Sequence, residues 1–271
     1  MCRIFCDVSG QGEKVCRNGG QRKATMRFPI DFTVDYLMAG PEERLRMAAL
    51  LRMFQEAAVR HAELRGFGGA EMARRHCAWV MYKLETDIWE YPRVGETVRV
   101  LTTLGGWKGL RAYRHFELWQ EGKFLAKGLS VWFMIDLESR RPLHITPDLF
   151  EAVRTLPGFP PAVPEREWKP AKETAWERDY PQTLRFSDLD ANGHVNNTVY
   201  ADLLETALAW ENGGICPPLG TLRIQFNHEI SPQVREVRVG IGTAERGWCF
   251  AILGSDLVHA VGEVSPFAKE A

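Results

Sequence analysis

Residues 183–214 read TLRFSDLDANGHVNNTVYADLLETALAWENGG, and we interpret them as a strand, a polar corner and a helix in succession. Thr183–Ser187 is predicted as the strand and Asp188–His194 as the turn. A helix should run from about Asn197 to Glu211, because apolar side chains recur on one face and Gly213-Gly214 then stops it. That apolar face consists of Val199, Tyr200, Leu203, Leu204, Ala207 and Leu208.

Four further strands are predicted after this helix, and the connections between them are short. Short connections imply antiparallel pairing. The strands are expected at Thr221–Ile230, Val234–Thr243, Trp248–Asp256 and Leu257–Val264. A helix followed by such a sheet packs economically when the sheet curls around the apolar face of the helix.

The first half of the chain shows the same order of elements. A strand at Phe28–Asp35 precedes a helix that should open at Gly40-Pro41 and close near Arg65 and Gly66. Four strands should follow, at Trp79–Trp89, Gly95–Leu104, Leu110–Gln120 and Lys123–Asp136. The fold class is therefore predicted as α+β, a tandem double hotdog in which two antiparallel sheets each wrap around a central helix.

Domain boundaries follow from composition. Residues 1–25 are polar and read as a flexible tail, and 26–150 form the first hotdog unit. Six of the 15 prolines fall between residues 157 and 181, so 151–181 reads as a linker. Residues 182–271 form the second unit.

Charge and composition exclude several classes of protein. The 34 Lys and Arg residues balance 35 Asp and Glu residues, which argues against a protein that holds nucleic acid by its phosphates. No apolar run is long enough for a membrane span. Six cysteines without a CxxC pair suggest a reduced, cytoplasmic protein. Scattered histidines and the lack of a Gly-rich phosphate loop predict no metal and no cofactor.

The corner carries the polar groups that suit chemistry. Asp190, Asn192 and His194 alternate, so in an extended segment they would point the same way. They precede a helix N-terminus, whose free N–H groups favour negative charge. This combination suits an oxyanion site, although turn and cap roles explain about half of the polar residues.

The run from Asp190 to Tyr200, DANGHVNNTVY, resembles the DxNxHVNNxxY signature of acyl-acyl-carrier-protein thioesterases. Matches in the first half extend the resemblance over about residues 28–265. Among them are Phe54–Ala57 with His61-Ala62, Gly66-Phe67, Tyr91-Pro92, Gly95-Glu96, Val131–Met134 and Arg140-Arg141. Together they imply hydrolysis of the thioester of fatty acyl-acyl carrier protein, which releases the free fatty acid and ends chain elongation.

Residue by residue, the resemblance implies catalytic roles for Asp190, Asn192, His194 and Glu229. Glu229 should act as general base on water or attack directly. On the predicted strand Glu229 shares a face with Arg223, Gln225 and Asn227, while His228 falls on the apolar face. Plant members commonly have Cys after this Glu; Ile230 stands here, so a thiol nucleophile at that position is impossible.

Substrate-binding groups are expected at the same corner. Asn192, with the helix N-terminal amides near Asn196 and Asn197, should hold the carbonyl and the developing oxyanion. The first half has Val34–Gly40 before its helix, without His or Asn, so it should be non-catalytic and form the acyl-chain pocket. Its candidate lining residues are Trp79, Met81, Trp89, Trp132 and Met134.

The implied partner is an acidic acyl carrier protein, and the chain should be a monomer or a homodimer. A basic surface near the pocket is expected from Arg44, Arg46, Arg60, Arg93, Lys108, Arg111 and Arg114. Three alternatives remain open: an acyl-CoA thioesterase of the hotdog class, a hotdog dehydratase, and a non-catalytic acyl-binding protein.

Overall fold

The computed structural model describes residues 27–146, 164, 167–171 and 176–267. The predicted tail, residues 1–25, and part of the predicted linker lie outside the described residues. The first half comprises β1 (Phe28–Thr33), α1 (Met47–Leu64), α2 (Gly69–Arg74), β2 (Cys77–Ile88), β3 (Thr97–Lys108), β4 (Arg111–Gln120), β5 (Lys123–Asp136) and β6 (Pro142–Leu143). The second half comprises β7 (Arg178–Thr183), the 3-10 turn Phe186–Asp188, α4 (Val199–Glu211), β8 (Leu219–Phe226), β9 (Glu236–Ala244), β10 (Gly247–Leu253) and β11 (Val258–Pro266).

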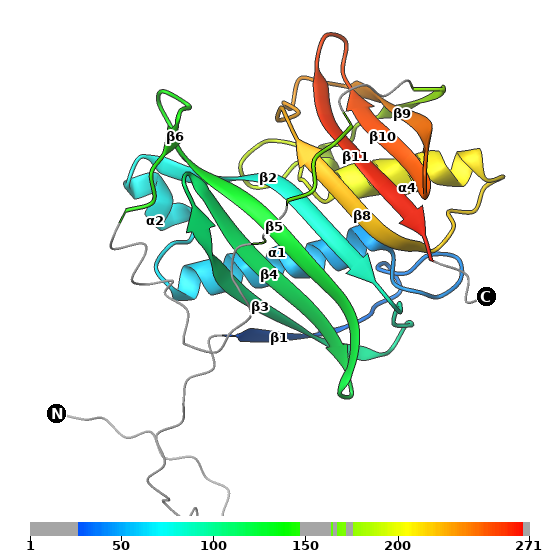
Figure 1. Ribbon diagram of the computed structural model, residues 1–271, viewed down its shortest axis with the longest axis horizontal. Coiled ribbons are helices and arrows are strands. Elements are labelled where there is room, and N and C mark those ends of the chain that lie inside the picture. Colours follow the sequence, from blue (N-terminus) through cyan, green and yellow to red (C-terminus); the bar gives the residue numbers. More distant parts are fainter. Residues whose placement is uncertain (1–26, 147–163, 165–166, 172–175, 268–271) are drawn as a thin grey trace, which may run out of the picture.

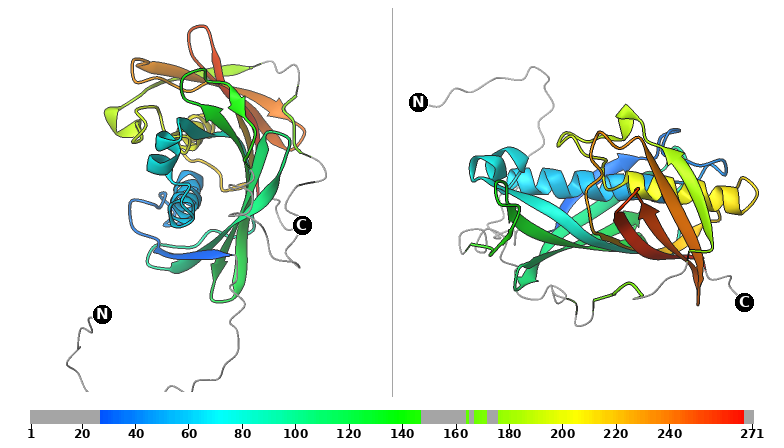
Figure 2. Two further views of the ribbon diagram at one scale, coloured as in Figure 1. Left: turned by 90° about the vertical axis from the view of Figure 1, so that its left-hand side faces the viewer. Right: turned by 90° about the horizontal axis from the view of Figure 1, so that it is seen from above.

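Antiparallel strands curve around a long helix in each half, which is the predicted double hotdog (Figures 1 and 2). Helix α1 buries its apolar face, and ten of its residues are buried. Gly128 on β5 permits this close packing: a Cβ there would lie 2.8 Å from the ring of Phe54. Phe54 in turn stacks on Phe116 of β4, with ring centroids 4.8 Å apart.

The two predicted sheets join into one. The strand order is β1-β3-β4-β5-β2-β8-β11-β10-β9-β7, with β6 paired to β5. The halves meet where β2 runs antiparallel to β8, with Glu85 opposite Arg223, and these two side chains form an ion pair at 3.3 Å. Sequence patterns locate strands but not the partner of each edge, so the union of the sheets was not predicted.

Several predicted boundaries are wrong. Helix α1 begins at Met47 and not at Pro41, because residues 39–45 form a bridged turn first. Strand β3 passes through Gly105-Gly106 by a register shift, since glycines accommodate a bulge as readily as a turn. Helix α2 was not predicted.

The strand predicted at Thr183–Ser187 is also misplaced. Strand β7 covers Arg178–Thr183 and overlaps the end of the predicted linker. It contains Pro181, which is tolerated because β7 is at the edge of the sheet and Pro has no N–H to donate. The segment that follows turns through Phe186–Asp188 into the corner.

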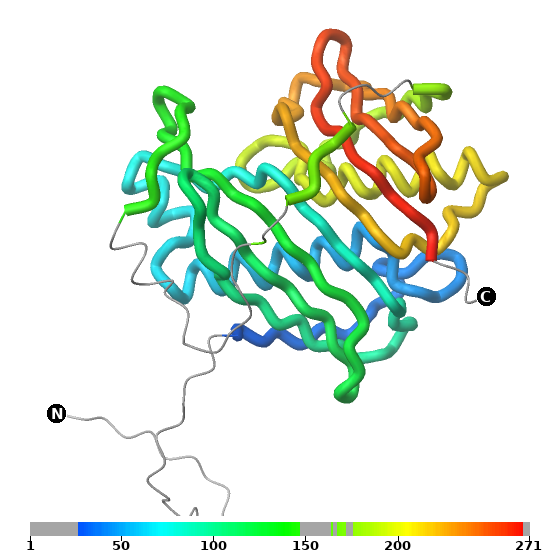
Figure 3. Tube along the Cα trace, in the orientation of Figure 1, coloured from blue at the N-terminus to red at the C-terminus, as the bar shows by residue number. Residues whose placement is uncertain are grey.

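Residues 167–171 cross the outer face of the joined sheet where its two halves meet (Figure 3), and the indole N–H of Trp168 donates to Glu263 of β11 at 3.3 Å. The ammonium group of Lys83 donates to the carbonyl of Trp168 at 2.7 Å, and Arg111 pairs with Glu167 at 2.8 Å. The outer face of the joined sheet is thus partly covered by the chain that connects the halves.

Candidate active site

The polar corner of the second half is a tight turn held by backbone hydrogen bonds. The Asp190 N–H donates to the His194 carbonyl at 2.8 Å, and the Gly193 N–H donates to the Asp190 carbonyl at 3.0 Å. Gly193 has φ +78°, a region where side chains cost energy. The Val195 N–H then donates to the Ile230 carbonyl at 3.0 Å, so the corner is attached to the loop after β8.

Asp190 organises this turn. One carboxylate oxygen accepts the Asn192 N–H at 2.8 Å and the His194 N–H at 3.4 Å. The other accepts the Asn192 amide at 3.4 Å. Asn192 is exposed, and the hydrogen bond of its side chain goes to Asp190. Asp190 therefore orients Asn192 directly and His194 through the backbone.

Glu229 lies beside His194. Oε2 of Glu229 is 3.5 Å from Nε2 of His194, and both side chains are about one-third exposed, at 37% and 36%. The predicted strand geometry is wrong here, because β8 ends at Phe226. Glu229 reaches the corner from a loop, so the face it would share with Arg223 and Gln225 does not position it.

His228 is exposed and not part of an apolar face. Its carbonyl is 3.2 Å from Nδ1 of His259 and accepts the Tyr200 hydroxyl at 3.5 Å. Burial raises the pKa of Tyr200, as does the nearby charge of Glu229, so this phenol stays protonated and remains a donor. Tyr200 thereby connects the loop after β8 to helix α4.

Sequence reasoning missed one residue of the site. Arg140 belongs to the turn between β5 and β6 of the first half, and its Nη2 lies 2.6 Å from Oε2 of Glu229. Arg140 and His194 therefore hold the same carboxylate oxygen, while Oε1 has no partner among the described residues. Arg140 was noted only as part of a family resemblance, and nothing in the sequence showed that it crosses to the other half.

A narrow apolar pocket begins at the start of α4 and enters the first half. Its walls are Asn197, Thr198, Leu51, Phe54, Gln55, Met81, Leu84, Phe116 and Trp132. The free volume is about 10 Å³, which is about the room that one water molecule needs. An acyl chain therefore enters only if lining side chains move.

The residues predicted to bind the acyl chain or the carbonyl divide into three groups. Met81, Trp132 and Asn197 line the pocket. Trp79 and Met134 pack in a separate cluster with Phe67, Met72 and Cys77. Trp89 is 53% exposed and packs against Phe124 outside the pocket, so the structure does not place it where it was expected.

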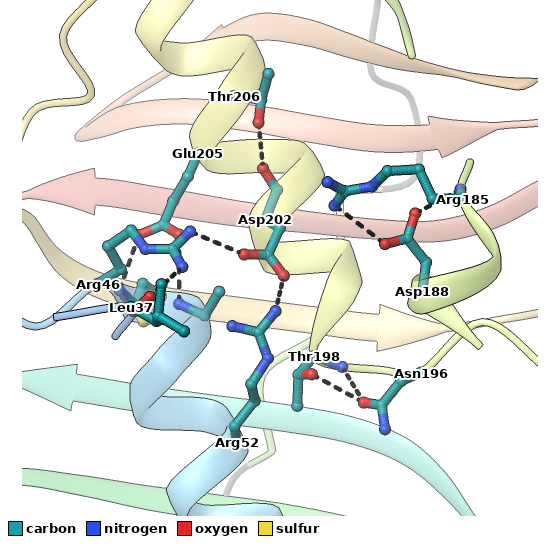
Figure 4. A network of polar contacts seen from close by, with 12 residues as sticks. Leu37, Arg46, Arg52, Arg185, Asp188, Asn196, Thr198, Asp202, Glu205 and Thr206 are labelled. Atoms are coloured by element: carbon teal, nitrogen blue, oxygen red, sulfur yellow. Dashed lines mark hydrogen bonds and ion pairs between the residues drawn. The ribbon is translucent and has the colours of Figure 1, made fainter. Parts of the chain in front are cut away.

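Asn196 faces the helix rather than the pocket. Its side-chain oxygen accepts the N–H and the hydroxyl of Thr198, both at 2.9 Å (Figure 4). Beyond it, the buried carboxylate of Asp188 pairs with Arg185 at 3.1 Å. These contacts fix the direction in which the chain enters α4.

Polar contacts also join the two helices (Figure 4). Asp202 of α4 pairs with Arg46 at 3.1 Å and with Arg52 of α1. Glu205 of α4 accepts the backbone N–H of Met47 at 2.8 Å, which caps the N-terminus of α1. Burial raises the pKa of Glu205 to about 7, against the opposing effect of this hydrogen bond.

The proposed basic surface is smaller than expected. Arg114 is 4% exposed and lies inside the fold, so it cannot belong to a surface. Carboxylates pair with four others, Arg44, Arg46, Arg60 and Arg111. A carrier would therefore meet a largely neutralised set of charges.

The described residues contain no group of three His, Cys, Asp or Glu side chains arranged to bind a metal ion. No helix in this part of the chain is long and apolar enough to cross a bilayer. Burial raises the pKa of the thiols of Cys77 and Cys249, and that of Cys216 to about 12. These three cysteines are therefore poor nucleophiles at neutral pH.

Two domains of one family match this chain. Residues 25–153 match the N-terminal domain of acyl-ACP thioesterases, and residues 171–232 match the C-terminal domain of the same family. Together these matches span most of the chain.

Two curated relatives of the chain are chloroplastic plant proteins. A chloroplastic dodecanoyl-[acyl-carrier-protein] hydrolase of Cinnamomum camphora is 32% identical over 193 residues, 66% of this chain and 50% of that protein. A chloroplastic palmitoyl-acyl carrier protein thioesterase of Gossypium hirsutum is 28% identical over 224 residues, 78% of this chain and 51% of that protein. The chain spans about half the length of these relatives.

Solved structures share the fold. An acyl-ACP thioesterase from Bacteroides thetaiotaomicron superposes with a TM-score of 0.77 at 22% identity, covering 89% of this chain and 97% of that one. The 12:0-ACP thioesterase from Umbellularia californica superposes with a TM-score of 0.75 at 19% identity, covering 89% and 96%. The double hotdog architecture is therefore shared across the length of these proteins.

Proposed function

Because the chain belongs to the acyl-acyl-carrier-protein thioesterase family, we propose that it hydrolyses the thioester of fatty acyl-acyl carrier protein. Water and the thioester give a free fatty acid and the carrier thiol. One observation supports this most directly: the 3.5 Å contact between His194 and Glu229 lies in the corner that leads into α4. Asn197, three residues after His194, lines the mouth of the apolar pocket.

Glu229 is the general base in this proposal. Its Oε2 is held by Arg140 and His194, which leaves Oε1 to accept a proton from water. The resulting hydroxide attacks the thioester carbonyl carbon, and the carbonyl oxygen becomes an oxyanion. When the C–S bond breaks, His194 donates a proton to the departing thiolate, and the proton that Glu229 took from water passes to His194 across their 3.5 Å contact, which returns both groups to their starting states.

Donors at the start of α4 stabilise the oxyanion. The backbone N–H of Asn197 makes no loop hydrogen bond within the described part of the chain, and Asn197 lines the pocket. The helix N-terminus adds positive potential at this position. Asp190 keeps the turn rigid so that His194 stays next to Glu229.

A second candidate function is hydrolysis of acyl-CoA. Carboxylates pair with four of the arginines expected to bind the carrier, so an acidic carrier would meet little uncompensated positive charge. The test compares turnover of the same acyl chain on acyl carrier protein and on CoA, with released thiol as the signal and chain length graded. A large excess of turnover on the carrier supports the proposal. Comparable or greater turnover on CoA supports the alternative, and acyl binding without thiol release would make the protein a non-catalytic acyl-binding protein.

We also propose that a single chain suffices for activity. The pairing of β2 with β8 supplies a contact between two hotdog units within one molecule, and Arg140 of one half already reaches Glu229 of the other. Light scattering at the assay concentration tests this, since activity confined to a dimer would contradict it.

A further inference from the structure

His259 is a buried imidazole that the proposed reaction does not use. It lies on β11 and is 4% exposed, and its Nδ1 is 3.2 Å from the carbonyl oxygen of His228. A carbonyl oxygen only accepts, so Nδ1 carries the ring proton and donates to this bond. Burial lowers the pKa of His259, against the opposing effect of hydrogen bonds to the backbone of His228 and Glu229. At neutral pH the ring is therefore uncharged, and its single N–H faces the loop that follows β8.

A β-bulge places His259 against this loop. Two adjacent residues of β10, Ile252 and Leu253, pair with residues 260 and 258 of β11, which leaves His259 as the extra residue between them. Bulges bend a strand and redirect a side chain, and they are common beside active sites. Both the ring and the backbone carbonyl of His259 contact the loop after β8 as a result.

His259 anchors the loop that carries Glu229 on the side that precedes Glu229. The N–H groups of Asn227 and His228 donate to the carbonyl of His259 at 2.8 and 3.2 Å. The ring of His259 donates in the opposite direction, to the His228 carbonyl, which also accepts the Tyr200 hydroxyl at 3.5 Å. That contact with Tyr200 is longer than an ordinary O–H···O bond, so the imidazole is the stronger of the two donors.

Ile230 anchors the loop on the other side of Glu229. It is fully buried, and its carbonyl accepts the Val195 N–H of the polar corner at 3.0 Å. Between the two anchors, the Glu229 carboxylate lies 3.5 Å from His194 and 2.6 Å from Arg140. No strand geometry directs Glu229, because β8 has already ended. The two neighbouring carbonyls and their donors therefore set the direction in which Glu229 points.

We propose that His259 is a positioning residue for the hydrolysis: its N–H holds the His228 carbonyl, and this contact keeps Glu229 beside His194. The inference rests on the proposed thioester hydrolysis and adds a residue to its site. His259 acts through Glu229 and contacts no reacting group. Without the ring, the His228 carbonyl keeps only the longer contact with Tyr200, so the loop gains freedom directly before Glu229.

The first test replaces the ring and measures steady-state turnover of an acyl-carrier thioester. His259→Leu removes the donor and should lower kcat by about 10- to 100-fold with KM unchanged, since a displacement of about 1 Å costs on the order of 10² in rate. His259→Asn keeps an N–H near the place of Nδ1 and should restore most of the lost rate, whereas the amide of His259→Gln lies nearer to Nε2 and should not. Equal kcat values in the Leu and Asn variants would overturn the inference, as would a loss confined to KM.

A double-mutant cycle separates positioning from general destabilisation. If His259 acts through Glu229, His259→Leu should cause no further loss of the residual kcat of Glu229→Gln. An additive loss in the double variant would contradict the proposal. The matched control is Val264→Ala, at another buried residue of β11, which should lower the denaturation midpoint and leave kcat unchanged. A comparable loss of kcat in Val264→Ala would overturn the proposal as well.

Hydrogen exchange tests the anchor without any turnover. The amides of His228 and Val195 close the loop on its two sides, and both should exchange about tenfold or more faster in His259→Leu, but not in His259→Asn. Gly254→Ala should have the same effect while keeping the imidazole, because a Cβ there would lie 2.7 Å from Nε2 of His259. If exchange responds in this way but the wild-type protein hydrolyses no thioester, the proposed reaction fails and the anchor stands. Unchanged exchange in both His259→Leu and Gly254→Ala would overturn the inference.

Discussion

The two halves of this protein contain the same corner with different side chains. In the first half the Gly40 N–H donates to the Arg44 carbonyl at 2.9 Å, and in the second the Asp190 N–H donates to the His194 carbonyl at 2.8 Å. A β-bridge closes each turn, between Ala39 and Leu45 in one and Leu189 and Val195 in the other. The corresponding residues are 150 positions apart.

The side chains at these matched positions decide which corner has the polar groups of a catalytic site. The second corner has Asp190, Asn192, His194 and Asn196, and the first has Gly40, Glu42, Arg44 and Arg46 at the same places. The segment expected to match, Val34–Gly40, was therefore placed too early, although the true match also lacks His and Asn. Both halves form the same backbone turn, and the side chains of the second half alone provide the polar groups of the candidate site.

The largest effect should come from the second corner. Glu229→Gln and His194→Ala should each lower kcat by about 10²–10⁴, as loss of an acid or base does. In the first corner, Arg44→Ala, at the position that matches His194, and Glu42→Gln, at the carboxylate of that corner, should leave kcat within about twofold, well inside the scale of a lost general base. Steady-state turnover of acyl-carrier thioester measures both, and equal losses in the two corners would refute the comparison.

Glu205 of α4 caps the N-terminus of α1. Its pKa is raised to about 7 in the folded protein. Glu205 therefore keeps a proton that the unfolded chain releases near 4.5. Stability should therefore fall as the pH rises from about 4.5 to about 7, by at most about 3 kcal/mol. Glu205→Gln should flatten this slope.

Denaturant unfolding across that pH range measures the Glu205 effect. Glu236→Gln, at an exposed carboxylate on β9, should leave the slope unchanged. A wild-type protein whose stability rises through this window would show that Glu205 is ionised in the folded state.

Arg140 connects the halves at the polar corner of the second half, and the effect of replacing it should be smaller. The ion pair with Glu229 is half exposed, and such pairs contribute about 0.2–1 kcal/mol. Arg140→Met should therefore lower kcat by about two- to fivefold without changing KM. Arg140→Lys should restore most of it, and Arg141→Met is the control. A change in KM alone would assign Arg140 to binding.

The smallest effect concerns one matched backbone position. Glu43 has φ +58° where Gly193 has φ +78°, and a side chain in this region costs about 1 kcal/mol. Gly193→Ala should destabilise by about that amount. Glu43→Gly should stabilise by about 0.5 kcal/mol, because added freedom of the unfolded chain offsets part of the gain. Chemical denaturation resolves both, and a destabilising Glu43→Gly would show that the carboxylate has a structural role.

Local pattern was sufficient for much of the fold. Apolar periodicity located helices α1 and α4, and alternation located the long strands, because these signals arise from the chain itself. The corner could be found from Asp190, Asn192 and His194, since polar groups crowded before a helix are a local feature. The role of Glu229 was predicted from the family resemblance. Its predicted position on a strand is wrong, because β8 ends three residues earlier, at Phe226.

What the sequence by itself determined is the repeated order of helix and strands and the polar corner in one copy. The tertiary structure alone decided that β2 and β8 join the sheets, that Arg140 reaches Glu229, and that Arg114 is buried. Each of these features depends on contacts between segments that are far apart in the sequence. Such contacts depend on strand edges and side-chain packing, which local periodicity does not encode.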